Sequence, residues 1–142
     1  MKKFELTGET KLWFGRTLHR IRALVAFGDV DVGELGGWIE NESNLDQSGD
    51  AWVYGDALVY GDARVYERRA IMWISVIGSR NDTVTFFACK GGIIGVTVGC
   101  FHGSIDEFAE KVRKTHGDNE HAQAYMIAIE LAKLRVKVEV PA

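Results

Sequence analysis

The sequence predicts an α+β fold: a mostly β N-terminal half with a short hexapeptide-repeat β-solenoid, then an antiparallel three-stranded meander with two C-terminal helices. Three observations carry this prediction: a period-six repeat in the middle of the chain, alternating apolar runs on both sides of it, and helical periodicity after residue 104. We expect two regions, residues 1–69 with the repeats at 39–68, and residues 70–142 as an α+β unit.

The composition is that of one folded domain. The chain has 142 residues, 46% of them apolar, and its 16 glycines accompany a single proline. High glycine without a Gly-X-Y period excludes collagen, and the ample apolar and aromatic content argues against disorder. Seventeen basic residues against 20 acidic ones give a formal net charge of −3, which indicates no strong affinity for duplex nucleic acid.

Neither a membrane span nor a secretion signal is expected. The longest apolar runs, near residues 71–77 and 93–98, fall far short of the roughly 18 residues that cross a bilayer. The first residues alternate polar and apolar side chains, whereas a signal peptide carries a continuous apolar run. These features predict a cytoplasmic protein.

Several strands are expected outside the repeat. Alternating apolar residues at 18–27 predict a half-buried strand, which the glycine-rich turns of residues 28–38 follow. The apolar and β-branched residues at 71–77, 83–90 and 93–101 predict three more strands. Turn residues separate these three strands, so an antiparallel meander is the simplest arrangement.

An internal repeat of six residues lies between these strands. Its units are residues 51–56 (AWVYGD), 57–62 (ALVYGD) and 63–68 (ARVYER), and a degenerate start is visible near Ile39. Aligning the units places valine, alanine and tyrosine in columns, with glycine and aspartate at the bends. This is the pattern of left-handed parallel β-helices, in which aliphatic side chains point into a narrow core.

The repeat tract is short for a solenoid. Residues 39–66 supply about one and a half coils, and repeat units need neighbours to bury their apolar faces. We therefore expect capping by the flanking regions or stacking on another copy, and so a homo-oligomer. Hexapeptide acyltransferases use a catalytic histidine beside longer coils, but the only histidine before residue 100 is His19, outside the repeat.

The C-terminal part changes to helical periodicity. Ser104 and Glu107 fit a capping box, and apolar residues then recur at helical spacing up to His116. Gly117 predicts the helix end, and Asp118 or Asn119 caps a second helix that continues to about Leu134. Residues 136–140 form either a short edge strand or a tail.

Three segments together carry a resemblance: GELGGWIENESNL before the repeats, IGSRNDTVTFF after them, and GCFHGSIDEFAEKVRKTHGDN at the start of the helices. The chain resembles an uncharacterised family of small bacteriophage and prophage proteins over nearly its whole length. Members are often labelled as transferases because of their hexapeptide-like repeats. The family provides no catalytic residues to transfer, and this chain has only three clear repeat units where many members have more.

The best candidate binding residues are Arg80, Asn81 and Asp82 in a turn, with Phe86 on the next strand. A guanidinium binds a phosphate bidentately, an amide reads a base or sugar edge, and an aromatic ring stacks on another ring. The alternative is a polar turn beside a core phenylalanine. Phe86 and Phe87 point to opposite faces of a strand, so at most one of them stacks on a ligand and at most one packs in the core.

A second candidate is the basic end of the first helix, which contains Lys111, Arg113, Lys114 and His116. Cations there also complement the helix dipole, which explains them without any ligand. The histidines are too widely spaced for a metal or catalytic set to be assembled from sequence. Cys89 and Cys100 lack zinc spacing and are expected to be buried thiols. We therefore predict no metal and no cofactor.

These observations favour a non-enzymatic binding protein over an enzyme. By analogy with phage proteins that counter host defence, its target would be a small anionic nucleotide-type signal, which it sequesters, or a host protein, which it blocks. The alternatives are a hexapeptide-repeat acyltransferase-like enzyme and a structural or assembly protein that oligomerises through its repeats.

Overall fold

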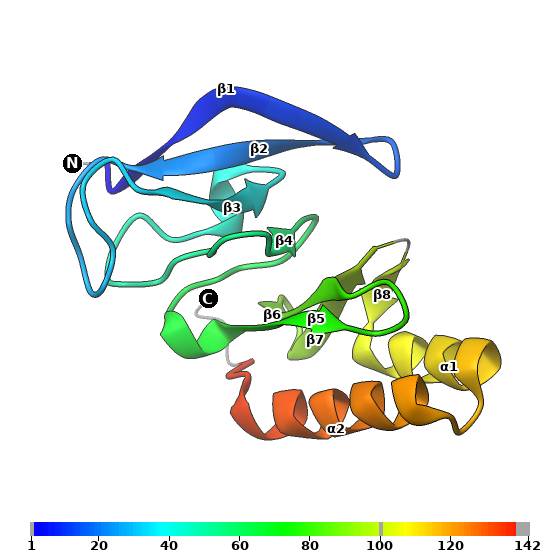
Figure 1. Ribbon diagram of the computed structural model, residues 1–142. Helices are drawn as coiled ribbons and strands as arrows, with labels where there is room; N and C mark the ends of the chain where they lie inside the picture. Colours follow the sequence, from blue (N-terminus) through cyan, green and yellow to red (C-terminus); the bar gives the residue numbers. More distant parts are fainter. Residues whose placement is uncertain (1, 100, 139–142) are drawn as a thin grey trace.

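The computed structural model describes residues 2–99 and 101–138 of the chain. Over these residues the protein is a mixed α+β structure with two four-stranded sheets and two helices. The first sheet, the second sheet and the helix pair form successive layers (Figure 1).

The first sheet has the order β1-β2-β3-β4 and is built from the N-terminal half. A long antiparallel hairpin, β1 and β2, is followed by β3, which pairs with β2 in antiparallel and with β4 in parallel. The bounds are Phe4–Trp13 for β1, Arg16–Ala23 for β2, Leu35–Ile39 for β3 and Leu58–Val59 for β4. Strand β1 was not predicted, and β2 ends at Ala23, earlier than the predicted strand at 18–27.

The second sheet has the order β5-β6-β7-β8 and is antiparallel throughout. Its strands are β5 (Ile71–Ile77), β6 (Asp82–Cys89), β7 (Ile93–Val98) and β8 (Phe101–Ser104). The prediction of a three-stranded meander is therefore wrong. The run expected as one strand at 93–101 turns back after Gly99, which has a positive φ of 42°; residue 100 lies outside the described residues.

The predicted β-solenoid is also wrong, because no coil of a β-helix closes in the described part of the chain. Parallel contacts do form, between β3 and β4 and between Leu45 and Val65. Within the repeat, however, β4 is the only named strand, and it is two residues long. Short 3₁₀ turns occur near the start and at the end of this tract, at Glu42–Asn44 and Arg68–Ala70.

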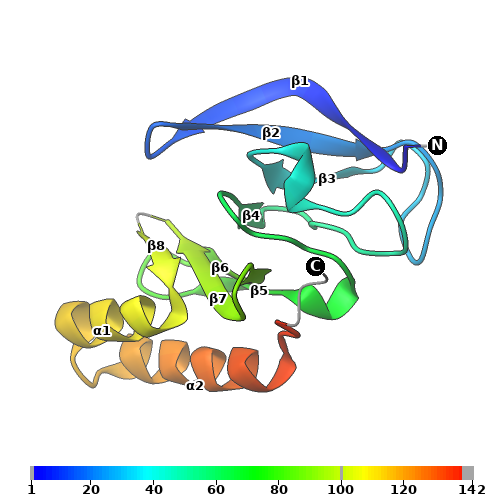
Figure 2. The same ribbon diagram turned by 180° about the vertical axis from the view of Figure 1, so that it is seen from behind.

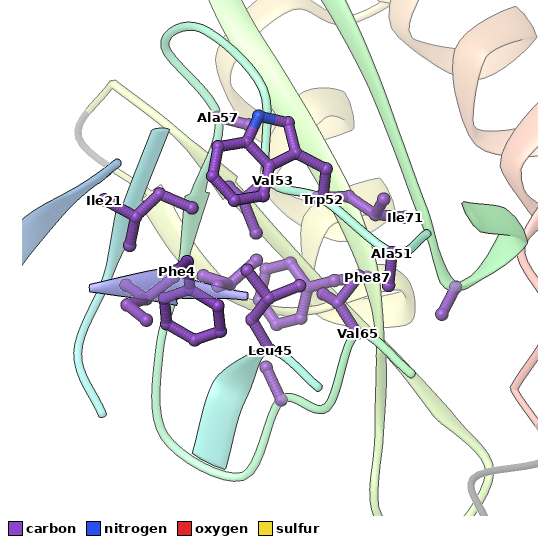
Figure 3. Packing of buried hydrophobic residues seen from close by; sticks show 14 of the residues in the cluster. Phe4, Ile21, Leu45, Ala51, Trp52, Val53, Ala57, Val65, Ile71 and Phe87 are labelled. Atoms are coloured by element: carbon purple, nitrogen blue, oxygen red, sulfur yellow. The ribbon is translucent and has the colours of Figure 1, made fainter. Parts of the chain in front are cut away.

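The valine column of the repeat explains this difference. Val53, Val59 and Val65 are fully buried, but they share a core with Phe4 of β1 and Phe87 of β6 (Figure 3). The flanking sheets therefore cover the apolar face that further coils would cover in a solenoid. The repeats of two copies were expected to stack because of the solenoid, so this reason for expecting an oligomer no longer holds.

Two helices follow the second sheet and cover one of its faces (Figures 1 and 2). In α1 (Ile105–His116), Ser104 Oγ accepts a hydrogen bond from Glu107 N and Glu107 Oε1 accepts one from Ser104 N. In α2 (Glu120–Arg135), Asn119 Oδ1 accepts a hydrogen bond from Ala122 N. Both helices begin where the capping pattern predicts.

The chain beyond α2 has no regular secondary structure at residues 136–138, and the rest of the predicted strand or tail lies outside the described residues. Among the described residues, no helix is both long enough and apolar enough to cross a membrane.

Two hydrophobic cores meet at the second sheet. One lies between the first sheet, the repeat segment and one face of β6, and includes Trp52 and Phe87. The other lies between the second sheet and the helices, and includes Phe86 and Phe108. The first core contains Ile71 and Phe87, so it joins residues from both sides of position 70.

Close packing in the first core predicts a glycine requirement at position 37. A Cβ atom there would lie 2.5 Å from the carbonyl oxygen of Ala57 and 2.9 Å from Val53 Cγ1. We expect Gly37→Ala to lower the free energy of unfolding by about 1–3 kcal/mol, because the backbone must shift. The control is Gly8→Ala in β1, where nothing lies within 4 Å of the added atom. Urea denaturation should show the two variants to differ; equal stability would contradict this packing.

Candidate functional site

A cavity of about 200 Å³ lies where the second sheet meets the helices. Its walls come from four places: the β5–β6 turn, the β7–β8 turn, helix α1 and one side chain of α2. The lining residues are Ser79, Arg80, Asp82, Val98, Gly99, Phe101, Phe108, Lys111, Val112, Thr115, His116 and Tyr125. Segments from Ser79 to Tyr125 in sequence therefore contribute to one site.

The β5–β6 turn holds Arg80 at the rim through an unusual backbone. Val76, Gly78 and Asn81 all have positive φ, at 58°, 81° and 52°, and the pairing register shifts between Ile74 and Ile77. A positive φ is strained for a β-branched residue such as Val76. This chain of left-handed positions folds the turn tightly toward the helices.

Two glycines let the turns close on their neighbours. A Cβ atom at Gly78 would lie 2.0 Å from Tyr125 Oη, so the β5–β6 turn rests directly against that ring. A Cβ atom at Gly99 would lie 2.4 Å from Asp82 Oδ2, so the two turns approach each other closely. The cavity is therefore shaped by backbone contacts that larger residues would prevent.

Helix α1 supplies the other wall. Phe108, the pair Lys111 and Val112, and the pair Thr115 and His116 follow one another at intervals of three to four residues, so they lie on one side of the helix. Phe108 and Val112 are buried and form the apolar part of this wall, whereas Lys111 and Thr115 are exposed at its edge.

Aromatic rings line the inner part of the cavity. The centroid of Phe108 is 5.3 Å from that of Phe101 and 5.2 Å from that of Tyr125. His116 stacks on Tyr125 with centroids 6.2 Å apart and planes at 27°. The ring of His121 lies 5.5 Å from that of His116, on the side of α2. This cluster gives the cavity flat apolar surfaces.

The electrostatics of the rim are set by Arg80 and Lys111. Both side chains are exposed, and neither forms an ion pair with any residue that the structure describes. Asp82 is half-buried at the same cavity, close to Gly99. Two cations, one carboxylate and a histidine therefore surround an aromatic interior.

The structure brings together residues from both predicted candidates. Arg80 and Asp82 of the turn line the same cavity as Lys111 and His116 of the helix. Asn81 is exposed in the turn and does not line the cavity.

The remaining predicted residues lie elsewhere. Phe86 is fully buried, 6.4 Å from the ring of Phe108, behind the cavity wall. Arg113 and Lys114 are exposed on other sides of α1. The helical spacing of Lys111, Thr115 and His116 was a signal that could have separated the lining residues from Arg113 and Lys114.

Phe101 and Tyr125 were missed as site residues. Phe101 was expected inside a continuous strand, and Tyr125 was expected only as part of the apolar face of the second helix. Nothing local in the sequence indicates that the β7–β8 turn and α2 meet at Arg80.

The remaining histidines and cysteines that the structure describes do not form a metal site. Over the described residues, no group of three or more histidine, cysteine, aspartate or glutamate side chains is placed to bind a metal ion. His102 is exposed on β8, where its Nδ1 lies 3.2 Å from Tyr60 Oη. Cys89 is buried with a free thiol, and Cys100 lies outside the described residues.

Comparisons of this chain with protein-family models, with curated proteins and with solved structures find no match.

The environment of Cys89 predicts an unreactive thiol. Burial, together with the nearby negative charge of Asp62, raises its pKa to about 12. At pH 8 we expect iodoacetamide to alkylate Cys89 only after denaturation, because the thiolate is the nucleophile. Peptide mass spectrometry can follow this residue separately from Cys100. Rapid alkylation of Cys89 in the folded protein would contradict the burial.

The same pKa shift gives a pH dependence of stability. The pKa of this thiol is higher in the folded state than its ordinary value of 9, so its stabilising contribution is complete below pH 9. As pH rises from 9 toward 12, the unfolded state loses the proton first and the free energy of unfolding falls. Cys89→Ala should reduce this alkaline loss relative to wild type, measured by urea denaturation at pH 8 and pH 10.5.

Proposed function

We propose that this chain is a non-enzymatic binding protein whose cavity holds a small anionic, nucleotide-like molecule. The observation that carries the proposal is the position of Arg80 and Lys111, which come from separate elements and border one aromatic-lined cavity without an ion-pair partner among the described residues. A bound anion would provide both cations with an ion-pair partner, which none of the described residues provides.

The two kinds of lining suit the two parts of such a ligand. A guanidinium and an ammonium group bind a phosphate by charge-assisted hydrogen bonds. The half-buried ring of Phe101 offers apolar surface for a planar base, and the buried rings of Phe108 and Tyr125 lie behind it. The cavity, at about 200 Å³, is smaller than the roughly 300–1,000 Å³ of typical ligand pockets. This favours one phosphorylated ring system over a large dinucleotide.

The biological role follows from the resemblance to phage proteins. In a phage protein, a site of this kind would sequester a nucleotide signal of the host's defence and so keep it from its receptor. An acyltransferase or an assembly protein built on stacked coils is not proposed, because both depended on a solenoid, and no coil of one closes among the described residues.

Isothermal titration with adenosine 5′-monophosphate and 3′,5′-cyclic AMP tests the proposal. We expect each to bind without turnover and more tightly than adenosine, which lacks the phosphate. Arg80→Ala and Lys111→Ala should each weaken binding by about 10- to 100-fold, because each removes a charge-assisted hydrogen bond worth about 1.5–3 kcal/mol.

Arg113→Ala and Lys114→Ala are the matched controls. These variants remove the same charge from the same helix, but their side chains do not line the cavity. They should leave affinity within about twofold of wild type. Equal losses in all four variants would indicate only a diffuse charge effect, and no heat with any phosphorylated ligand would overturn the proposal.

A further inference from the structure

The outward face of α2 is apolar, which is unusual for a helix on a protein surface. Ile127, Leu131 and Leu134 are 70%, 44% and 78% exposed. They are four and three residues apart, so they form one stripe along the helix. The opposite face of α2 is also apolar, because Ala128, Ile129 and Ala132 pack into the core below the second sheet. A helix that is apolar on both faces is expected to have a partner on each.

The two flanks of this stripe carry opposite charge. On one side, a groove between α1 and α2 is lined by Asp106, Glu107, Glu110 and Glu130, with Arg113 and Lys133 as its only cations in the described residues. On the other side, a hollow between α2, β5 and the turn before β5 is lined by the cations Arg68, Arg69 and Arg135 and by apolar side chains that include Met72. The stripe thus separates an acidic flank from a basic one.

We propose that the α2 stripe is the interface of a homodimer in which the two α2 helices lie parallel about a two-fold axis. The spacing of Ile127, Leu131 and Leu134 is that of the core positions d, a and d in a heptad. In this register Glu130 is the g position of one heptad and Arg135 is the e position of the next. In parallel pairs these positions face each other across the seam, so Glu130 of one copy meets Arg135 of the partner subunit.

Charge selects the parallel arrangement over the antiparallel one. About a two-fold axis along the helices, the acidic flank of each copy faces the basic flank of its partner. In an antiparallel pair each flank would face its own copy, acid against acid and base against base, which is unfavourable. Parallel helix dipoles oppose this choice only weakly, because their effect is screened and confined to the terminal turns.

The rest of the molecule leaves this face accessible. In both views the helices form the outer layer (Figures 1 and 2), and the three side chains of the stripe are exposed. The cavity that contains Arg80 opens at the other end of the helix pair, near His116 and Gly117. Dimerisation through the stripe is therefore separate from ligand binding.

Three variants, each with one cysteine added to the two native ones, test the arrangement: Ile127→Cys, Leu131→Cys and Leu134→Cys. In a parallel pair, equal positions meet along the axis, so all three should form disulfide-linked dimers under mild oxidation. An antiparallel pair would link at one level at most, because a disulfide needs Cα atoms within about 7 Å. Wild type, which carries the two native cysteines, and Lys114→Cys on α1 are the controls and should stay unlinked.

Light scattering after size exclusion tests the interface without cross-linking. Wild type should have twice the 15.8 kDa mass of one chain, whereas Leu134→Glu should be monomeric with an unchanged circular dichroism spectrum. Arg135→Glu should weaken the dimer at least tenfold, and adding Glu130→Arg should restore it. A wild-type monomer would overturn the proposal, and so would a dimer that Leu134→Glu leaves intact. Wild-type monomer that sediments with anionic lipid vesicles would assign the stripe to a membrane surface.

Discussion

The structure depends on the burial of β6 on both of its faces. Phe86 packs toward the helices and Phe87 toward the first sheet, and each is almost fully buried. Phe87 has room only because Gly95 lies opposite it on β7, where a Cβ atom would come within 2.4 Å of its ring. Burying two phenylalanines stabilises the fold by several kcal/mol, about 1.5–3 kcal/mol for each. One strand thus holds the two layers of the molecule together.

Two buried threonines, Thr85 on β6 and its register partner Thr97 on β7, lie next to Phe87 and complete this junction. Thr85 Oγ1 accepts a hydrogen bond from Leu58 N, and Thr97 Oγ1 donates one to the carbonyl oxygen of Leu58. These bonds satisfy polar groups that would otherwise be costly to bury, and they fix β4 against the second sheet. The same strand β6 begins at Asp82, so the turn that carries Arg80 is positioned by the core on which α1 also packs.

Local signals in the sequence predicted local structure well. The capping residues Ser104 and Asn119 located both helix starts, because a cap acts within three residues of itself. The repeat was misleading because its valine spacing specifies an inward-facing column but not the identity of the neighbouring layer. That layer is made by Phe4 and Phe87, 49 residues before and 34 residues after Val53. The site shows the same limit: its cations were recognisable as residue types, but only the tertiary structure places Arg80 and Lys111 at one cavity.

The proposed function requires Arg80 and Lys111 to act together on one anionic ligand. The most direct test is a titration of ¹⁵N-labelled protein with adenosine 5′-monophosphate, followed by amide chemical shifts in nuclear magnetic resonance spectra. Saturable shifts should be confined to both walls of the cavity, residues 78–82 and 111–117, and adenosine and inorganic phosphate should each give smaller changes. Shifts confined to one wall, or spread over unrelated basic surface, would contradict it.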